Sequence, residues 1–76
     1  MDCKIIETVA VLSRKGAWSL ELNLVSWDDK PMKYDIRKWN EDHAKCSKGI
    51  TLTESEAGVL LNALTGRLKG AIVNAE

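Results

Sequence analysis

Between residues 17 and 27 apolar and polar side chains alternate, and this pattern restricts the fold more than any other feature of the chain. A period of two sends successive side chains to opposite faces of an extended strand, whereas a helix has a period of about 3.6. Each face receives one kind of side chain, Trp18, Leu20, Leu22 and Leu24 on the first and Ser19, Glu21 and Asn23 on the second. The segment is therefore predicted to be a half-buried strand, although the alternation slips at Val25 and leaves the face of Trp27 open.

Three more segments have the composition of strands. Residues 4–13 are rich in β-branched types, and the turn after them contains Gly16, which adopts positive φ without steric cost. Residues 28–31 hold two aspartates and a proline, which predicts a second turn before a strand at residues 32–39. Residues 48–52 are predicted to be a short fourth strand, in which Gly49 marks a bulge or a close approach of two backbones.

A single helix is predicted to follow the strands. Thr53 and Glu56 form a capping box, which starts the helix at Glu54. Its end is expected at Gly66 or Gly70. Apolar residues recur at helical spacing in one broad stripe, Ala57, Leu60, Leu61, Leu64 and Leu68, widened by Val59 and Ala63. Because this stripe exceeds what one small sheet needs, a second copy of the helix is expected to pack on it, through Val59, Leu60, Ala63 and Leu64.

The 76 residues are expected to form one domain, with its core in residues 4–68 and a loose tail at residues 70–76. A domain of this size buries only about 60% of the surface that its unfolded chain exposes. The cysteines, Cys3 and Cys46, are too few for a disulfide framework. The predicted fold is α+β, a four-stranded antiparallel sheet followed by one C-terminal helix, and a homodimer is the expected source of further stability.

Positive charge is concentrated in residues 30–48, although the whole chain has a formal net charge of zero. That segment contains six Lys or Arg residues and three acidic ones. On its predicted strand Lys33, Arg37 and Trp39 share a face, which would provide cations for phosphates and a flat ring for an unstacked base. A charged outer face is also the ordinary property of a half-buried strand, so both interpretations stay open. Trp39 is expected to be exposed and Trp18 to lie in the core.

Catalytic and metal chemistry are not predicted. His43 and Cys46 have a spacing compatible with a metal pair, but a structural zinc site normally needs four ligands in paired motifs. The chain has one histidine, no glycine-rich phosphate loop and no Ser-His-acid pattern. We therefore expect no enzyme activity, no metal and no cofactor.

The apolar stretch at residues 5–12 does not predict a targeting or membrane segment. It is interrupted by Glu7 and Thr8, and no small-residue cleavage site follows a basic start. We therefore expect neither a signal peptide nor a membrane anchor, with reduced thiols in the cytoplasm.

Two motifs follow one another in the second half of the chain. Residues 33–39 read Lys-Tyr-Asp-Ile-Arg-Lys-Trp, and residues 48–52 read Lys-Gly-Ile-Thr-Leu, followed by the acidic capping box and the leucine-rich helix. Over residues 17–68 this order resembles the transcriptional coactivator family called positive cofactor four, most closely its small bacterial YdbC-like branch. The two motifs and their spacing carry the resemblance.

The resemblance implies a curved sheet, dimerisation through the helices, and binding of single-stranded DNA with little sequence preference. Carried over by position, Arg37 would lie near the DNA, and Lys48 would contact phosphate where Gly49 lets the backbone approach. Trp39 corresponds to the aromatic position of the family, where a ring stacks on bases. The candidate nucleic-acid-binding residues are accordingly Trp18, Lys33, Arg37, Trp39, Lys45, Lys48 and Gly49.

The chain departs from the family along the predicted second strand, where relatives often have basic residues and it has Ser19, Leu20 and Leu24. Two hypotheses follow. The first is a homodimeric, sequence-tolerant single-stranded DNA-binding protein that acts in transcription regulation, replication or repair, with the transcription machinery as a further partner. The second is a protein-interaction module on the same fold with weak or no nucleic-acid binding. RNA is an alternative ligand, since only a contact to the 2′-hydroxyl separates it from DNA.

Overall fold

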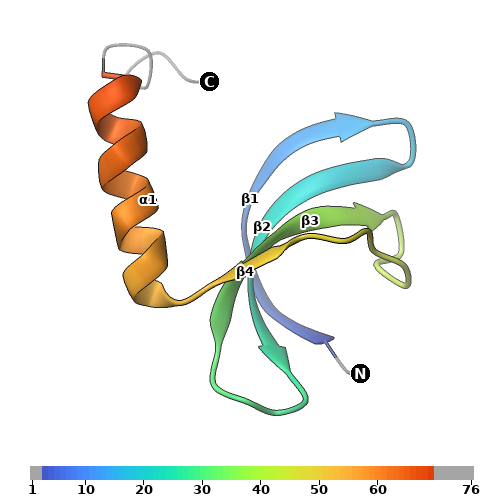
Figure 1. Cartoon of the computed structure of the whole chain (residues 1–76). Helices are drawn as coiled ribbons and strands as arrows, with labels where there is room; N and C mark the ends of the chain where they lie inside the picture. The colour runs from blue at the N-terminus through green and yellow to red at the C-terminus, as the bar shows by residue number, and fades with distance from the viewer. Residues whose placement is uncertain (1–2, 70–76) are drawn as a thin grey trace.

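A computed structural model describes residues 3–69 of the chain. Within them lie four strands and one helix (Figure 1), namely β1 (Cys3–Lys15), β2 (Trp18–Trp27), β3 (Lys33–Asn40), β4 (Ile50–Leu52) and α1 (Glu54–Arg67). The strands form one antiparallel sheet in the order β1-β2-β3-β4, and α1 follows the sheet. The predicted α+β fold is therefore confirmed.

Both hairpin turns form where the sequence predicts them. Gly16 joins β1 to β2 with a φ of 62°. Between β2 and β3, Asp28 and Asp29 have φ values of 49° and 62°. The N–H of Lys30 donates to the carbonyl of Trp27 at 2.8 Å. Two consecutive left-handed residues give the twist of a type I′ hairpin, and aspartate tolerates this conformation better than most residues.

Gly49 lies immediately before β4, which is shorter than the predicted segment of residues 48–52. A Cβ at this position would meet the Cβ of Arg37 and the carbonyl oxygen of Ile36. The predicted close approach of two backbones is therefore confirmed. At Gly49 the chain lies directly against β3, and this contact fixes the end of the preceding loop.

β1 is irregular against β2, with shifts of register at three points. Each shift leaves one extra residue on β1, at Ile6, Val9 and Leu12. Such bulges bend a strand and increase its twist. The register between β2 and β3 has no shift, so Val25 and Trp27 keep the alternation and lie on the face of Asn23. The sheet is curved, convex toward α1 and concave on its other side (Figure 1).

The sheet has two faces of opposite composition, as the alternation predicts. We call them the polar face, which bears Ser19, Glu21, Asn23, Asp35 and Arg37, and the leucine face, which bears Leu20, Leu22, Leu24, Tyr34 and Ile36. The polar face also carries the buried hydrophobic residues Val25 and Trp39, so the core of residues 3–69 lies on this side. The polar face is the more buried, since Glu21 is 3% exposed and Asn23 and Asp35 are 0% exposed. The leucines of β2 are only half-buried, because the sheet curls around its polar side.

α1 begins at Glu54, as predicted, behind a complete capping box. The side-chain oxygen of Thr53 accepts the N–H of Glu56 at 3.1 Å, and the N–H of Thr53 donates to the Glu56 carboxylate at 2.8 Å. The helix runs through Gly66 and ends at Arg67 with Leu68 as its C-cap, so a stop at Gly66 is wrong, and the alternative stop at Gly70 lies outside the described residues. No helix within residues 3–69 has the length and hydrophobicity needed to cross a membrane. The predicted tail at residues 70–76 lies outside the described residues.

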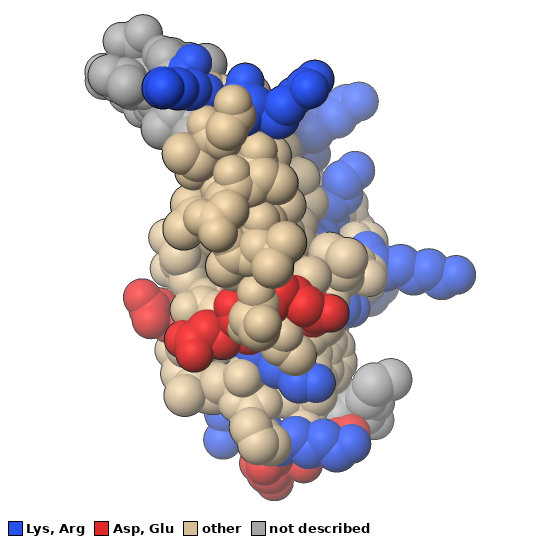
Figure 2. Space-filling model, turned by 60° about the vertical axis from the view of Figure 1, so that its left-hand side comes forward, with Lys and Arg blue, Asp and Glu red and all other residues tan. Residues whose placement is uncertain are grey.

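An apolar groove of about 220 Å³ separates α1 from the leucine face. Its walls include Leu22, Ile36 and Leu52 from the sheet and Leu60, Leu61 and Leu64 from α1. Not one residue of the helix is buried, and Leu61 is 64% exposed. Figure 2 shows an uncharged surface over α1, with acidic side chains across its first turn and basic ones beyond its last turn. The single chain thus leaves much of its apolar surface uncovered.

Candidate nucleic-acid interface

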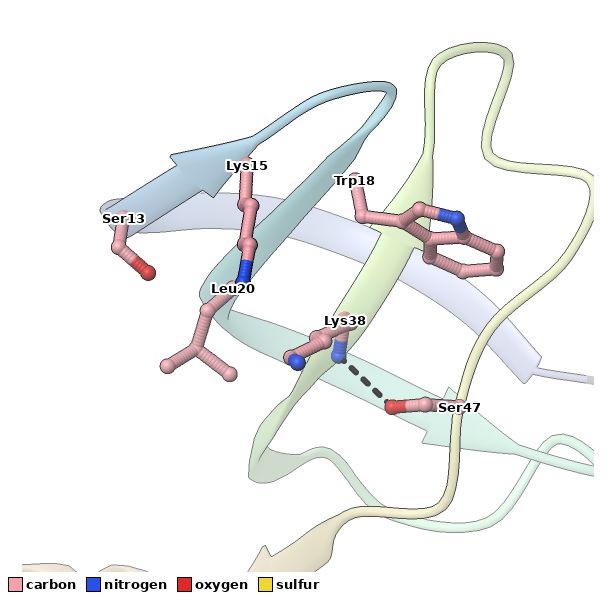
Figure 3. Close-up of a pocket in the computed structure, with 6 residues that line it drawn as sticks. All are labelled: Ser13, Lys15, Trp18, Leu20, Lys38 and Ser47. Carbon is pink, nitrogen blue, oxygen red and sulfur yellow. Dashed lines mark hydrogen bonds between the residues drawn. The ribbon is translucent and has the colours of Figure 1, made fainter.

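A pocket with an exposed tryptophan lies on the leucine face, where β1 turns into β2. It has a volume of about 390 Å³ and is lined by Ser13, Lys15, Trp18, Leu20, Lys38 and Ser47 (Figure 3). We call it the Trp18 pocket. The Trp18 residue is 39% exposed, so its indole remains accessible to a ligand.

The pairing of three strands brings these side chains together. Lys15 lies opposite Trp18, and Ser13 lies opposite Leu20. Leu20 in turn lies opposite Lys38 on β3. Residues opposite one another in antiparallel strands share a face, so Ser13, Leu20 and Lys38 form one row across the sheet, and Lys15 and Trp18 form the neighbouring row (Figure 3).

The loop of residues 41–49 closes one side of the pocket through Ser47. The Oγ of Ser47 accepts a hydrogen bond from the N–H of Lys38 at 3.1 Å and donates to the carbonyl of Lys48 at 2.8 Å. The N–H of Ser47 donates to the carbonyl of Lys38 at 3.0 Å. These bonds hold the pocket wall against β3, with Lys48 directly after it.

The Trp18 pocket combines an aromatic plane with unpaired positive charge. In the part of the chain that the structure describes, neither the Lys15 nor the Lys38 ammonium group has a hydrogen-bond or ion-pair partner. Aromatic rings that stack on bases and cations that contact phosphates are the two main components of single-strand binding sites. The pocket therefore has the chemistry to bind a flat ring that is linked to phosphate.

On the polar face the buried carboxylate of Glu21 accepts hydrogen bonds from three side chains. Glu21 accepts hydrogen bonds from Ser19 Oγ at 2.5 Å, Asn23 Nδ2 at 3.1 Å and His43 Nε2 at 3.0 Å. Burial alone would raise the pKa of Glu21, but these hydrogen bonds outweigh it, so its pKa lies below the ordinary value. Because the carboxylate stands between the hydroxyl and the imidazole, His43 cannot take the proton of Ser19 as in a Ser-His-acid triad. The network fixes the loop to the sheet.

A second ion pair on the polar face neutralises Arg37. Its Nε and Nη2 donate to the two carboxylate oxygens of Asp35 at 2.7 and 2.8 Å, and Thr51 donates to the same carboxylate at 2.9 Å. The guanidinium lies 4.9 Å from the ring centroid of Trp27. Hydrogen bonding to Asp35 raises the pKa of Arg37, and its side chain is only 13% exposed. The charge of Arg37 is thus already balanced within the fold.

The exposures of Trp18 and Trp39 are the reverse of those predicted from the sequence. Trp39 is 5% exposed and packs on His43, with ring centroids 5.6 Å apart, so the prediction of an exposed ring there is wrong. Trp18, predicted to lie in the core, is 39% exposed, so that prediction is also wrong. The reason is the curvature of the sheet, which closes over the polar face and leaves the hairpin end of the leucine face open.

The remaining candidates lie in different places. Lys33 and Arg37 share the face of Trp39, as predicted, but this face is the concave one. Lys33 is exposed at the opposite end of β3 from the Trp18 pocket. The hydrogen bonds of the capping box lower the pKa of Glu56, and the positive charge of Lys33 lowers it further. Lys45 and Lys48 are exposed on the loop that forms the pocket wall. The close approach at Gly49 is made to β3.

Most of the pocket is not among the site residues predicted from the sequence, namely Ser13, Lys15, Leu20, Lys38 and Ser47. A signal for part of it lies in the segment of residues 15–18, Lys-Gly-Ala-Trp. A two-residue hairpin loop pairs the residue before it with the residue after it, which here sets a lysine beside a tryptophan. The position of Lys38 in the pocket depends on the register between β2 and β3, so the sequence of β3 alone does not predict it.

The candidate metal residues have other contacts. His43 Nε2 lies 3.0 Å from the Glu21 carboxylate, and Cys46 is joined to Trp39 by an isolated β-bridge. Among residues 3–69 no group of three or more His, Cys, Asp or Glu side chains converges in a way that could hold a metal ion. Cys3 and Cys46 are free thiols, and burial raises the pKa of Cys3.

Comparison with known proteins gives one bacterial relative. The chain is 50% identical over 54 residues to an uncharacterized protein of Treponema pallidum (strain Nichols). The aligned region covers 70% of this chain and 64% of that protein, so the chain spans less than two thirds of the length of its relative. No protein-family model matches the chain.

Proposed function

We propose that this chain binds single-stranded DNA at the Trp18 pocket with little dependence on sequence. The observation that carries the proposal is the exposed Trp18 ring beside the unpaired Lys15 and Lys38. Stacking on an indole tolerates any base because every base has a π-face, and each lysine can neutralise one phosphate. A single strand is favoured over a duplex because duplex stacking hides the base faces that the ring must reach.

The resemblance to the positive cofactor four family supports the same ligand. Lys45 and Lys48 extend from the loop that forms the pocket wall, so they are proposed to contact phosphates further along the strand. Arg37 and Trp39 are assigned structural roles instead, because one is paired and the other is buried. Lys33 is not part of the proposed site, because it lies at the other end of β3 and on its other face. In the cell, such a protein would hold melted DNA during transcription, replication or repair, in the cytoplasm and alongside the transcription machinery.

The proposal is tested by titrating a labelled short oligo-dT with the protein and following anisotropy at low and high salt. Trp18→Ala is expected to weaken binding by about 1–3 kcal/mol, which is typical of one base stack. Lys38→Met is expected to weaken binding and to shallow the salt dependence by about 0.7 for one lost phosphate contact. Lys33→Met is the matched control, since it changes the same residue type on the same strand but on the opposite face.

The outcomes separate the hypotheses. Equal affinities of wild type and Trp18→Ala, or equal losses in Lys33→Met and Lys38→Met, would exclude the Trp18 pocket as the site. Absence of binding by wild type even at low salt would favour the protein-interaction module, with the apolar groove as its surface. Matching affinities for oligo-rU and oligo-dT would make RNA an equal ligand.

A homodimer packed through α1 is the second part of the proposal. Val59 is 67% exposed and Leu60 is 38% exposed, and a second helix would remove both from water. The helix is acidic in its first turn, at Glu54 and Glu56, and basic in its last turn, at Arg67. Two copies in antiparallel orientation would therefore place opposite charges beside each other, with Val59, Leu60, Ala63 and Leu64 in the interface.

Sedimentation velocity tests the dimer. Wild type is expected to sediment with the mass of two chains, and Val59→Glu with the mass of one, because a buried unpaired carboxylate would oppose association. Val59 does not line the groove, so this substitution leaves the packing of α1 on its own sheet intact. Thr65→Glu adds the same charge to an exposed position on the side of α1 away from the proposed interface, and is expected to remain dimeric. A wild-type monomer at micromolar concentration, or a dimeric Val59→Glu, would contradict packing through α1.

A further inference from the structure

We infer that the Trp18 pocket prefers thymine and uracil over cytosine, a preference that rests on the single-strand binding proposed above. A base stacked on Trp18 would meet the polar atoms of the side chains that line the pocket. Four of the six lining side chains are polar, and none of them is a carboxylate or an amide. The hydrogen-bonding groups in reach are therefore ammonium groups and hydroxyls.

The polar atoms left free in the pocket are mainly donors. The ammonium groups of Lys15 and Lys38 can only donate, and neither has a partner within residues 3–69. The hydroxyl of Ser47 donates its proton to the carbonyl of Lys48 and accepts the N–H of Lys38. Ser13 adds a hydroxyl that can act in either sense. A base thus meets positive charge from two strands and little acceptor capacity.

This distribution favours keto oxygens over exocyclic amino groups. Thymine presents its O4 acceptor where cytosine presents its N4 amino donor, in rings of the same size. At the 4-position a keto oxygen would accept a charge-assisted hydrogen bond from a lysine, whose ammonium has three N–H donors and can contact a phosphate as well, whereas an amino group there would face like charge. Leu20 lies between Ser13 and Lys38 in the sheet and could also contact the thymine methyl group, which uracil lacks. A comparison of thymine, uracil and cytosine separates these two effects.

The experiment measures the affinities of oligo-dT, oligo-dU and oligo-dC of equal length, so that backbone charge is constant. Wild type is expected to bind oligo-dT and oligo-dU about fivefold or more tighter than oligo-dC, the size of one charge-assisted hydrogen bond at a half-open site. Lys15→Met and Lys38→Met are expected to bind all three more weakly and to bring the dT/dC ratio toward one. Lys33→Met, on the opposite face, is expected to keep the wild-type ratio.

Each other outcome overturns the inference in a distinguishable way. Equal binding of oligo-dT and oligo-dC by wild type would remove the preference and leave the proposed function standing. Tighter binding of oligo-dT than of both oligo-dU and oligo-dC would assign the selectivity to the methyl contact with Leu20. An unchanged dT/dC ratio in both Lys15→Met and Lys38→Met would remove the lysines as its cause. Absence of binding by all three oligomers would overturn the proposed function as well.

Discussion

The substitution Glu21→Gln tests whether the buried polar face holds the fold together. The Glu21 carboxylate accepts hydrogen bonds from Ser19, Asn23 and His43 at 2.5, 3.1 and 3.0 Å. A hydrogen bond to a charged group contributes about 1.5–3 kcal/mol, against about 0.5–1.5 kcal/mol for a neutral one. Glutamine keeps the shape but loses the charge on three bonds, and its amide offers one accepting oxygen in place of two. We expect a loss of about 2–4 kcal/mol in unfolding free energy at pH 7.

The loss is expected to depend on pH in a defined direction. The pKa of Glu21 in the folded chain lies below the ordinary value of a glutamate, because three hydrogen bonds outweigh burial. A lowered pKa means that the folded state binds the proton less readily than the unfolded state. The stabilisation is therefore complete above the unfolded pKa and disappears as the pH falls through the folded pKa. Glutamine does not titrate, so the difference between the two proteins is expected to shrink on acidification below pH 4.5.

Urea unfolding followed by circular dichroism, at pH 7 and at acidic pH, measures both effects. Protein concentration is held constant because association stabilises the folded state. Glu7→Gln is the matched control, since Glu7 is exposed on β1 and its substitution should change stability by less than about 0.5 kcal/mol. Stability of Glu21→Gln within this margin of wild type at pH 7, or a loss that is the same at both pH values, would refute the reasoning.

Two further predictions concern the backbone. Gly49→Ala would press a methyl group against Arg37 and the backbone of Ile36, and should cost about 1–3 kcal/mol in urea unfolding. Gly58→Ala, whose Cβ would meet no atom within 4 Å, is its control and should stabilise α1 by up to about 1 kcal/mol. Equal effects of the two would contradict the close approach at Gly49. Thr53→Ala removes the capping hydroxyl and should cost about 1 kcal/mol; unchanged stability would contradict the capping box.

The order of the elements could be predicted because each signal is local. The alternation in β2 and the capping box at Thr53 depend on neighbours within a few residues, and both predictions are confirmed. The curvature could not be predicted, because Ile6, Val9 and Leu12 are ordinary strand residues whose bulges appear only when β1 pairs with β2. A reader who does not know that the sheet is curved has no reason, from the sequence, to expect that the polar face is the buried one.

The candidate site was harder to predict because it depends on three strands at once. Trp39 looks exposed when β3 is considered alone, since it follows Arg37 and Lys33 on an apparently polar face. That face is buried because the sheet curves around it, and its polar groups tolerate the burial because they bond to one another, as Asp35 does with Arg37. Trp18 is exposed because it lies at the hairpin end of the face that the sheet leaves open.

The same burial explains how a chain with zero net charge can have a positive site. Glu21 and Asp35 contribute two of the negative charges, but both carboxylates are enclosed on the polar face with His43, Arg37 and their other donors. The charge of Arg37 is cancelled there as well. The lysines of the Trp18 pocket point from the opposite face and have no such partner among the described residues. The net charge of the whole chain therefore understates the positive electrostatic potential at the Trp18 pocket, because charges that cancel within the fold contribute little to the field that a ligand meets.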